Sequence, residues 1–143
     1  FSFGGELNVD VDRNFKLGAK VEYFSYSTIG EKEAWNLPDL KGSLFMDYQI
    51  DDTWFAGAGL FYIGERKDQF LQESNNEFIS PLQQTMTLDS YFDANVHVGY
   101  RLNDQLSFYV KANNLADKTY QRWINTPVQG IQFLVGATYQ FDF

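Results

Sequence analysis

The sequence predicts an all-β protein, an antiparallel meander of about seven strands with no helix. The first observation behind this prediction is that apolar and polar residues alternate with a period of two in one segment after another, whereas the 3.6-residue period of an amphipathic helix is not found. The second is that short connections of turn composition alternate strictly with long connections. Strands joined in this way run antiparallel, with the short turns at one end of the sheet and the long connections at the other.

The first four strands are predicted between residues 1 and 64. In 1–12 the odd positions are apolar or glycine, and the even positions are polar or glycine. Segments 16–25 and 40–50 divide in the same way, with a largely apolar face opposite a face that carries charged residues. Segment 54–64 is the weakest, because both of its faces are apolar or small. One apolar and one polar face are typical of an antiparallel strand that is covered on one side.

Three more strands are predicted in the last third of the chain. Segments 91–102 and 106–114 alternate as clearly as the first segment does. In 131–143 every second residue from Ile131 to Phe143 is apolar, and the residues between them are largely polar. The final strand therefore has one wholly apolar face.

The connections between these strands fall into two kinds. Asp and Asn dominate the short ones, and both residues suit tight turns because they tolerate positive φ and hydrogen-bond to their own backbone. The short turns are predicted at 12–14 (DRN), 51–53 (DDT) and 103–105 (NDQ). The long connections are predicted at roughly 26–39, 65–90 and 116–128.

Alternation alone also fits a soluble β-sandwich or a lipocalin, in which the polar face is solvated. One feature that favours a transmembrane barrel instead is the position of the aromatic residues near the ends of the apolar faces. A Tyr or Trp ring there can sit in the acyl layer while its polar tip reaches the headgroups. These residues are Tyr23, Tyr48, Trp54, Tyr100, Tyr139 and Phe143.

Two further features favour the barrel. Short turns at one end and long loops at the other are the outer-membrane arrangement, periplasmic and extracellular respectively, and runs of about ten residues suit a tilted strand that crosses a membrane. Charged residues lie on the polar faces of six strands, as they do where such faces line a lumen. They are Glu6, Asp10, Lys20, Glu22, Asp47, Asp93, Arg101, Lys111 and Asp142.

Seven strands are expected to be only part of a barrel. An open edge is costly in hydrocarbon, because each unpaired backbone group costs several kcal/mol. An antiparallel barrel of seven strands does not close, and the alternation is already present at Phe1. The prediction is therefore an antiparallel meander of about seven transmembrane strands within a larger outer-membrane β-barrel.

Composition excludes several other classes of protein. The formal charge of −8 argues against nucleic acid as a partner, because phosphate binding needs clustered Lys and Arg. The absence of Cys excludes thiolate metal sites and a disulfide scaffold. No apolar run approaches the length of a membrane helix, and no signal peptide is visible, so for an exported protein this is expected to be a mature or truncated chain.

A combination of short motifs closes the sequence, in LDSYFDANVHVGYRLNDQLSFYVKANNLADKTYQRW and PVQGIQFLVGATYQFDF. Over about residues 88–143 it resembles the C-terminal end of TonB-dependent outer-membrane receptors. These tend to show an Asn-Leu-x-(Asp/Asn)-Lys-x-Tyr element, a loop with Pro and Gly, and a final strand with an aromatic last residue. The family often has Pro-Gly-Arg in this loop, whereas this chain has PVQG, so no role of that basic residue is carried over. The matching residues are Asn114, Leu115, Asp117, Lys118, Tyr120, Pro127, Gly130 and Phe143.

The resemblance implies that 1–143 is the C-terminal segment of a receptor barrel in the outer membrane of a Gram-negative bacterium. The plug domain and the energy-coupling box would then lie in an N-terminal part that is not in this chain. The implied function is uptake of a scarce nutrient, a chelated metal or a glycan fragment, energised through TonB. Expected partners are outer-membrane lipid, the barrel assembly machinery, TonB, and the remaining strands and plug of the same receptor. A plugless porin, or a structural barrel subunit of an outer-membrane assembly, is the alternative.

The resemblance also suggests a role for the end of the last strand. Tyr139, Phe141 and Phe143 are expected to form the signal that the barrel assembly machinery reads. The competing interpretation is that these three aromatic residues are only lipid-facing surface.

Few residues point to chemistry. His97 is the only histidine, and a catalytic role for it would need a nucleophile such as Ser107 beside it. Glu6, Asp10 and Asp12 share a strand face, but alternate strand positions are about 7 Å apart and no calcium-type loop follows. The sequence therefore predicts no enzyme, no catalytic residue, no metal site and no cofactor.

The long loops carry the candidate ligand contacts, which are Trp35, Arg122 and Trp123, with Phe70 and Phe78 as further exposed aromatics. Aromatic rings beside polar groups suit sugars or flat chelates. They suit loop packing equally well, and the sequence leaves both interpretations open.

Overall fold

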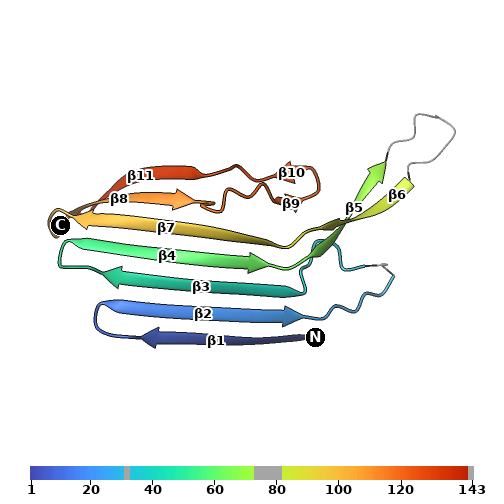
Figure 1. The fold of residues 1–143 in the computed structure, drawn as a ribbon, viewed down its shortest axis with the longest axis horizontal. Coiled ribbons are helices and arrows are strands. Elements are labelled where there is room, and N and C mark those ends of the chain that lie inside the picture. Colours follow the sequence, from blue (N-terminus) through green and yellow to red (C-terminus); the bar gives the residue numbers. More distant parts are fainter. Residues whose placement is uncertain (31–32, 73–81, 142–143) are drawn as a thin grey trace.

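One seven-stranded antiparallel sheet forms most of the computed structural model, which describes residues 1–30, 33–72 and 82–141 (Figure 1). The strand order is β1-β2-β3-β4-β7-β8-β11, so the sheet is a meander with β1 and β11 at its two edges. The predicted all-β, seven-strand meander is confirmed. The strands are β1 (Ser2–Asp10), β2 (Phe15–Phe24), β3 (Leu40–Gln49), β4 (Trp54–Ile63), β7 (Tyr91–Arg101), β8 (Leu106–Asn113) and β11 (Gln132–Tyr139).

Two hairpins lie outside this sheet, at its loop end (Figure 1). The long hairpin pairs β5 (Arg66–Gln72) with β6 (Leu82–Leu88), and the short hairpin pairs β9 (Gln121–Trp123) with β10 (Thr126–Pro127). The prediction of plain connections in these regions was wrong. RKDQFLQ is mostly polar on both faces, and β9 and β10 are very short, so no period-two signal marks them. LQQTMTL does alternate, but the alternation is short and its apolar face is interrupted by Gln84.

The three short turns of the sheet share one geometry. Asp51 Oδ1 accepts hydrogen bonds from the backbone N–H of Thr53 at 2.8 Å and of Trp54 at 2.7 Å. Asp12 and Asn103 hold the other two turns in the same way. The Thr53 hydroxyl donates a hydrogen bond to the same Asp51 oxygen at 2.7 Å. This hydrogen bond is the main reason why the pKa of Asp51 is lowered. The turn chemistry read from the sequence therefore acts as expected.

The strand register places the largely apolar side of each of the seven strands on the same side of the sheet, called the apolar face below. Because each strand pairs with its neighbour without a shift of face, apolar residues form rows across the sheet. One row crosses every strand and consists of Val9, Leu17, Met46, Ala58, Val96, Ala112 and Phe133.

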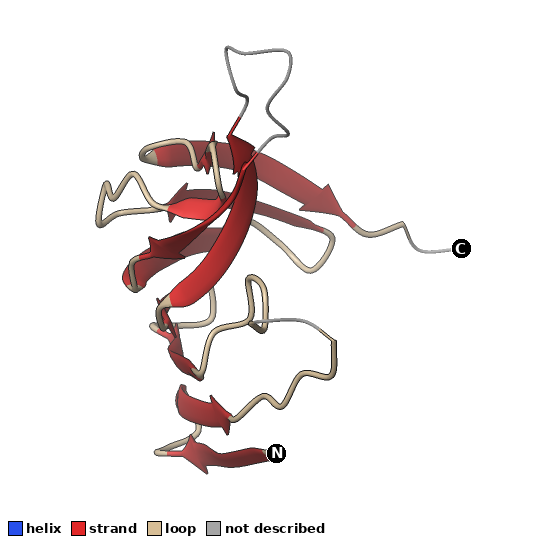
Figure 2. Ribbon diagram, turned by 90° about the vertical axis from the view of Figure 1, so that its right-hand side faces the viewer, coloured by secondary structure: helices blue, strands red, loops and turns tan. Residues whose placement is uncertain are grey.

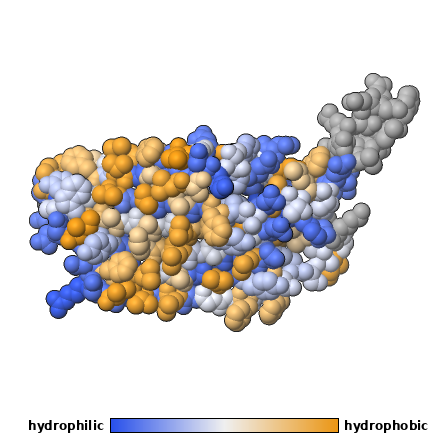
Figure 3. Space-filling model, in the orientation of Figure 1, coloured by the Kyte–Doolittle hydropathy of each residue, from blue (hydrophilic) through white to orange (hydrophobic). Residues whose placement is uncertain are grey.

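No second layer of the described chain covers the apolar face. Figure 2 shows the strands as one curved layer, and Figure 3 shows apolar side chains gathered over the strands, with polar ones toward the loop end. Phe133 and Val135 are each 74% exposed. Among the described residues the buried hydrophobic side chains are Leu88, Ala112 and Tyr120. A soluble sandwich buries such a face against a second sheet, so this arrangement fits a surface that faces lipid.

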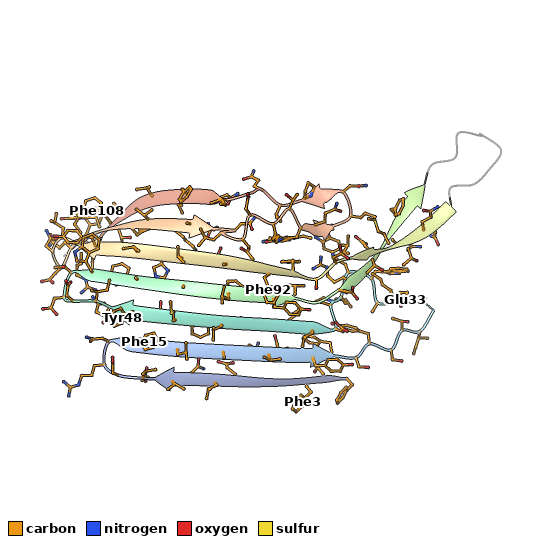
Figure 4. The ribbon with its side chains drawn as sticks, viewed as in Figure 1. Phe3, Phe15, Glu33, Tyr48, Phe92 and Phe108 are labelled. Carbon is orange, nitrogen blue, oxygen red and sulfur yellow. The ribbon has the colours of Figure 1, made fainter. Side chains whose placement is uncertain are left out.

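Aromatic pairs mark both ends of the apolar face. At the turn end the ring centroids of Trp54 and Tyr100 are 4.8 Å apart, and at the loop end those of Tyr62 and Phe92 are also 4.8 Å apart. From one pair to the other a strand rises about 26 Å, or about 20 Å of depth at a usual tilt. This separation approaches the apolar band of about 25 Å in outer-membrane barrels. Figure 4 shows Phe15, Tyr48 and Phe108 near the turn end, and Phe3 and Phe92 toward the loop end.

The opposite side, called the polar face below, has aromatic rings lying flat over glycines of the neighbouring strand. A Cβ added to Gly99 would lie 2.0 Å from Phe55 Cζ, and one added to Gly18 would lie 2.1 Å from Phe45 Cζ. The strand register makes each of these a direct cross-strand pair. The rings therefore occupy the space that a side chain would take, and they stay close to the sheet.

No helix in the described ranges has the length and hydropathy needed to cross a membrane.

Candidate functional site

The middle of the polar face does not assemble catalytic chemistry around His97. The imidazole lies over Gly57, with its Nε2 3.9 Å from Asp47 Oδ1. Its direct neighbour on β8 is Lys111, whereas Ser107 pairs with Arg101 further along the same two strands. The structure therefore separates His97 from the nucleophile that a catalytic role would need.

Two acidic residues near the start of the chain, Glu6 and Asp12, make local hydrogen bonds. Glu6 accepts a hydrogen bond from Asn8 Nδ2 at 2.7 Å, and Asp12 holds the first short turn through its carboxylate. Within the described residues no group of three or more His, Cys, Asp or Glu side chains could hold a metal ion. The buried polar side chains of the described chain, Arg66, Asp68 and Asn114, lie instead at the loop end of the sheet.

Two stacked tyrosines form the centre of the loop end. The rings of Tyr91, at the start of β7, and Tyr120, just before β9, are 3.6 Å apart and inclined by 8°. Tyr120 donates a hydrogen bond from its hydroxyl to Asp93 Oδ2 at 2.9 Å, and Arg66 Cζ lies 5.1 Å from the Tyr91 ring centroid. These contacts bring segments from three parts of the sequence into one cluster.

Arg66 and Asp68 connect the long hairpin to the short hairpin. The Arg66 guanidinium donates to the Gln121 carbonyl at 2.7 Å, and the backbone N–H of Ile124 donates to Asp68 Oδ2 at 2.8 Å. Both side chains are buried, with exposed fractions of 5% and 8%. Buried charged groups persist when they are hydrogen-bonded, so these two contacts fix how the hairpins lie against each other.

The residues of the Asn-Leu-x-Asp-Lys-x-Tyr element shape the chain between β8 and β9. Asn114 and Asp117 have positive φ values of 51° and 46°, and the Asp117 N–H donates to the Asn114 carbonyl at 2.9 Å. The Asn114 side-chain NH₂ donates to the carbonyls of Gln129 at 2.8 Å and Lys118 at 3.3 Å. The element therefore closes the loop that places Tyr120 on Tyr91.

A polar hollow of about 430 Å³, called the rim hollow below, opens between the loop ends of β7 and β8 and the short hairpin. Its walls combine one carboxylate, one guanidinium and several side-chain amides. Two acceptor atoms in its walls, Asp93 Oδ1 and Asn114 Oδ1, are buried with no hydrogen-bond partner. The residues that define it are Asp93, Asn95, Asn114, Arg122, Gln129 and Gln132.

The candidate loop contacts are spread over the loop end rather than gathered. Arg122 lines the rim hollow, whereas Trp35 lines a different hollow of about 490 Å³ and forms a parallel bridge with Lys67. Trp123 is 60% exposed on the short hairpin. Phe70 belongs to β5, and Phe78 lies outside the described residues.

Of the residues expected to form the assembly signal, Tyr139 and Phe141 are described, and both lie at the opposite end of the sheet. Tyr139 donates from its hydroxyl to Gln105 Oε1 at 3.2 Å, and its ring packs edge-on against Phe141 with centroids 4.8 Å apart. The two rings are 50% and 69% exposed. Phe143 lies outside the described residues.

Several residues of the loop cluster carry no mark in the sequence. Arg66 and Asp68 lie in a stretch without alternation, and their partners are more than fifty residues away, at separations of 55 and 56. Tyr91 is the first residue of a predicted strand, where an aromatic residue is common, so nothing in the sequence indicates its stacking on Tyr120. The alternation of apolar and polar residues reports only on neighbouring positions, so it cannot predict contacts between residues so far apart in the sequence.

Tyr120 supplies a test of this cluster at alkaline pH. Burial, and after it the hydrogen bond to Asp93, raises the pKa of Tyr120 above its ordinary value of 10.0. A raised folded-state pKa means that this contact stabilises fully below about pH 10 and is lost as the pH rises through the folded-state value. We expect absorbance at 295 nm to show a late-ionising tyrosine that Tyr120→Phe removes. In denaturant Tyr120 should ionise in the ordinary pH range of tyrosine, so the two titration curves should then differ only in that range. Identical titration curves of the two folded proteins would contradict the assignment.

Comparisons with known proteins agree with this geometry. A family model described as "TonB dependent receptor-like, beta-barrel" matches residues 2–115. No curated protein sequence matches the chain.

Similar solved structures are outer-membrane receptors. The ferripyoverdine receptor of Pseudomonas aeruginosa has a TM-score of 0.79 at 17% identity, over 98% of this chain and 19% of that chain. The siderophore receptor PirA of Acinetobacter baumannii has a TM-score of 0.80 at 21% identity, over 98% and 22%. The ferric-catecholate import receptor Fiu of E. coli K12 has a TM-score of 0.69 at 23% identity, over 96% and 20%. The chain spans about a fifth of each of these structures, and the likeness at such identities is one of fold.

Proposed function

The chain belongs to the family of TonB-dependent receptor-like β-barrels, and from this membership we propose that it is the C-terminal segment of a receptor that takes up a scarce nutrient. Its place is the bacterial outer membrane, and the family is one of receptors rather than enzymes. The observation that carries the proposal is the sheet itself. Its apolar face suits lipid, its polar face suits a lumen, and its hydrogen-bonding loops gather at one end.

The proposal extends to the parts of the receptor that complete the barrel. Further strands would pair with β1 and β11, which stand at the two edges of the sheet, because open edges are not tolerated in hydrocarbon. The polar face would then line a lumen that holds a plug, and TonB would supply the energy for uptake. Loops of this kind are where binding residues concentrate.

The substrate is proposed to be a chelated metal or a glycan fragment. Structures of similar fold include a receptor bound to ferripyoverdine, a siderophore receptor and a ferric-catecholate import receptor, and this supports the chelated metal. The loop end offers hollows of about 430 Å³ and aromatic rings beside polar groups, which suits either class.

The test of this proposal is energised uptake. We expect the complete protein, expressed in cells that lack their own siderophore receptors, to take up a labelled ferric chelate or oligosaccharide. Uptake should fall to background in the same cells without TonB. Equal accumulation with and without TonB would indicate a porin, and no accumulation of either class would contradict a receptor for nutrients.

We also propose that the end of β11 is read during barrel assembly, through Tyr139, Phe141 and Phe143. Assembly would lose a contact made while the strand is still unpaired, whereas the finished barrel would lose about 1.5–3 kcal/mol at most for one large apolar side chain. We expect Phe141→Ala to lower the amount of protein inserted in the outer membrane of cells, but not the yield of refolding into lipid vesicles.

Phe133→Ala is the matched control for the assembly role. Phe133 lies on β11 itself, eight positions before Phe141, and its exposed fraction of 74% is close to the 69% of Phe141. The control should insert normally in cells. If both variants show equal losses of inserted protein in cells and of refolding yield in vesicles, the aromatic end of the chain after β11 is ordinary lipid-facing surface.

A further inference from the structure

Two phenylalanine rings, Phe45 and Phe61, form a small apolar patch on the polar face, called the lumen patch below. Phe45 leans across to β2 and covers Gly18, where an added Cβ would lie 2.1 Å from its Cζ. Phe61 leans along its own strand over Gly59, where an added Cβ would lie 3.2 Å from its Cε2. Gly18, Phe45 and Gly59 are direct cross-strand neighbours, so the two rings together cover one row across β2, β3 and β4.

The lumen patch is exposed although its strands are already paired on both sides. Phe45 is 41% exposed and Phe61 is 42% exposed. β3 lies between β2 and β4, and β4 lies between β3 and β7. Strands that close the barrel would pair with β1 and β11 at the edges of the sheet, so they leave these two rings uncovered. Only a group that lies inside the lumen can bury them.

Charged residues surround the lumen patch. Asp93 is the direct neighbour of Phe61 on β7, and Lys20 lies on the other side of it, two strands away on β2. Two residues from the Phe45 row toward the turn end, Lys16 and Asp47 are direct neighbours of opposite charge. An apolar centre inside a rim that carries both signs of charge is typical of a contact between proteins.

The shape of the lumen patch favours a protein surface over a small molecule. Sites for small molecules are concave and enclose most of their ligand. The two rings instead lie close to the sheet, because glycines leave room beneath them, and they present a flat surface. Phe45 also stands midway along β3, in the interior of the lumen rather than at its mouth. The hollows described above are lined by other residues.

We propose that the lumen patch is a docking contact for an apolar segment of the plug domain of the complete receptor. This inference rests on the proposed receptor function, and it names the part of the lumen wall that holds the plug and the chemistry of the contact. The chain spans about a fifth of the receptors of similar fold, so a receptor of that length has ample chain for a domain that covers the patch. Apolar side chains of the plug pack on the two rings, and its polar groups meet the charged rim. Buried aromatic residues of this kind carry a large share of the binding energy in protein contacts.

The test is hydrogen exchange of the plug in the complete receptor, purified in detergent and followed by mass spectrometry of its peptides. Phe45→Ala and Phe61→Ala each remove one ring, and each should make exchange of the docked plug segment about tenfold faster. Phe61→Leu keeps an apolar side chain and should retain most of the protection. Peptides of the barrel strands report in the same experiment whether the sheet itself has loosened.

Phe108→Ala is the matched control. Phe108 is 44% exposed, close to the two rings of the lumen patch, but it lies on the apolar face, where it pairs with Tyr100 and Ala137. Its loss should leave the exchange of the plug unchanged.

The outcomes separate the docking contact from the transport role. Faster plug exchange in both alanine variants, with the barrel strands and the control unchanged, supports the contact. Unchanged plug exchange, or acceleration that the barrel strands or Phe108→Ala share, overturns it while the receptor function stands. Weaker binding of a ferric chelate with normal plug exchange also overturns it, because the rings would then serve the transported compound. A plug that both variants loosen, in a protein without TonB-dependent uptake, contradicts the transport role and leaves the contact supported.

Discussion

An arginine in place of Leu44 should destabilise the folded barrel by about 2–4 kcal/mol, the usual cost of a cation at the lipid face near the bilayer midplane. Leu44 lies on the apolar face, where it pairs with Ala19 on one side and Leu60 on the other. It stands midway along β3 and inside the apolar band, where Gly42, two positions toward the loop end, pairs with Tyr62. A guanidinium there has apolar neighbours on both adjacent strands.

The measurement is unfolding by urea of the complete barrel refolded in lipid vesicles. Ser43→Arg is the matched control, since Ser43 is the preceding residue and lies on the polar face between Lys20 and Phe61. A lumen-facing arginine keeps its hydration, so we expect the control to cost less than about 1 kcal/mol. The assignment of the two faces is wrong if Ser43→Arg proves as costly as Leu44→Arg.

The second large effect is expected at Gly99, where a single methyl group has no room. The added Cβ would lie 2.0 Å from Phe55 Cζ and within 2.6 Å of two further ring atoms. Gly99→Ala must therefore push the Phe55 ring away from the sheet, and overpacking of this kind costs about 1–3 kcal/mol. The same unfolding measurement reports the loss.

Two further variants show whether the ring causes this loss. Gly5→Ala adds the same methyl group to a strand glycine that has nothing within 4 Å of the new atom, so it should be close to neutral. In the double variant Gly99→Ala with Phe55→Ala the clash is gone, and the two changes should not add. Additive losses would mean that Gly99 matters for a reason other than the ring above it.

The strands of the sheet were predictable because each one carries its own local pattern. In β7 and β11 the alternation of apolar and polar residues predicts both that the segment is a strand and which of its sides faces lipid. The turns were predictable for a similar reason: Asp12, Asp51 and Asn103 each hold a turn by bonding to residues two and three positions ahead. Interactions between residues that are only a few positions apart can be predicted from the local sequence.

The sequence by itself therefore determined the all-β class, the seven strands, their two faces and the family. Only the tertiary structure decided which ring covers which glycine, because Phe55 meets Gly99 through the register of two strands that are far apart in sequence. Only the tertiary structure placed Arg66 against Gln121 and left the Asn114 oxygen unpaired in the rim hollow. The physical reason is that a period of two is a property of a single strand, whereas these contacts depend on how separate segments pack together. The residues that make them are polar or aromatic, and their positions follow no periodic pattern in the sequence.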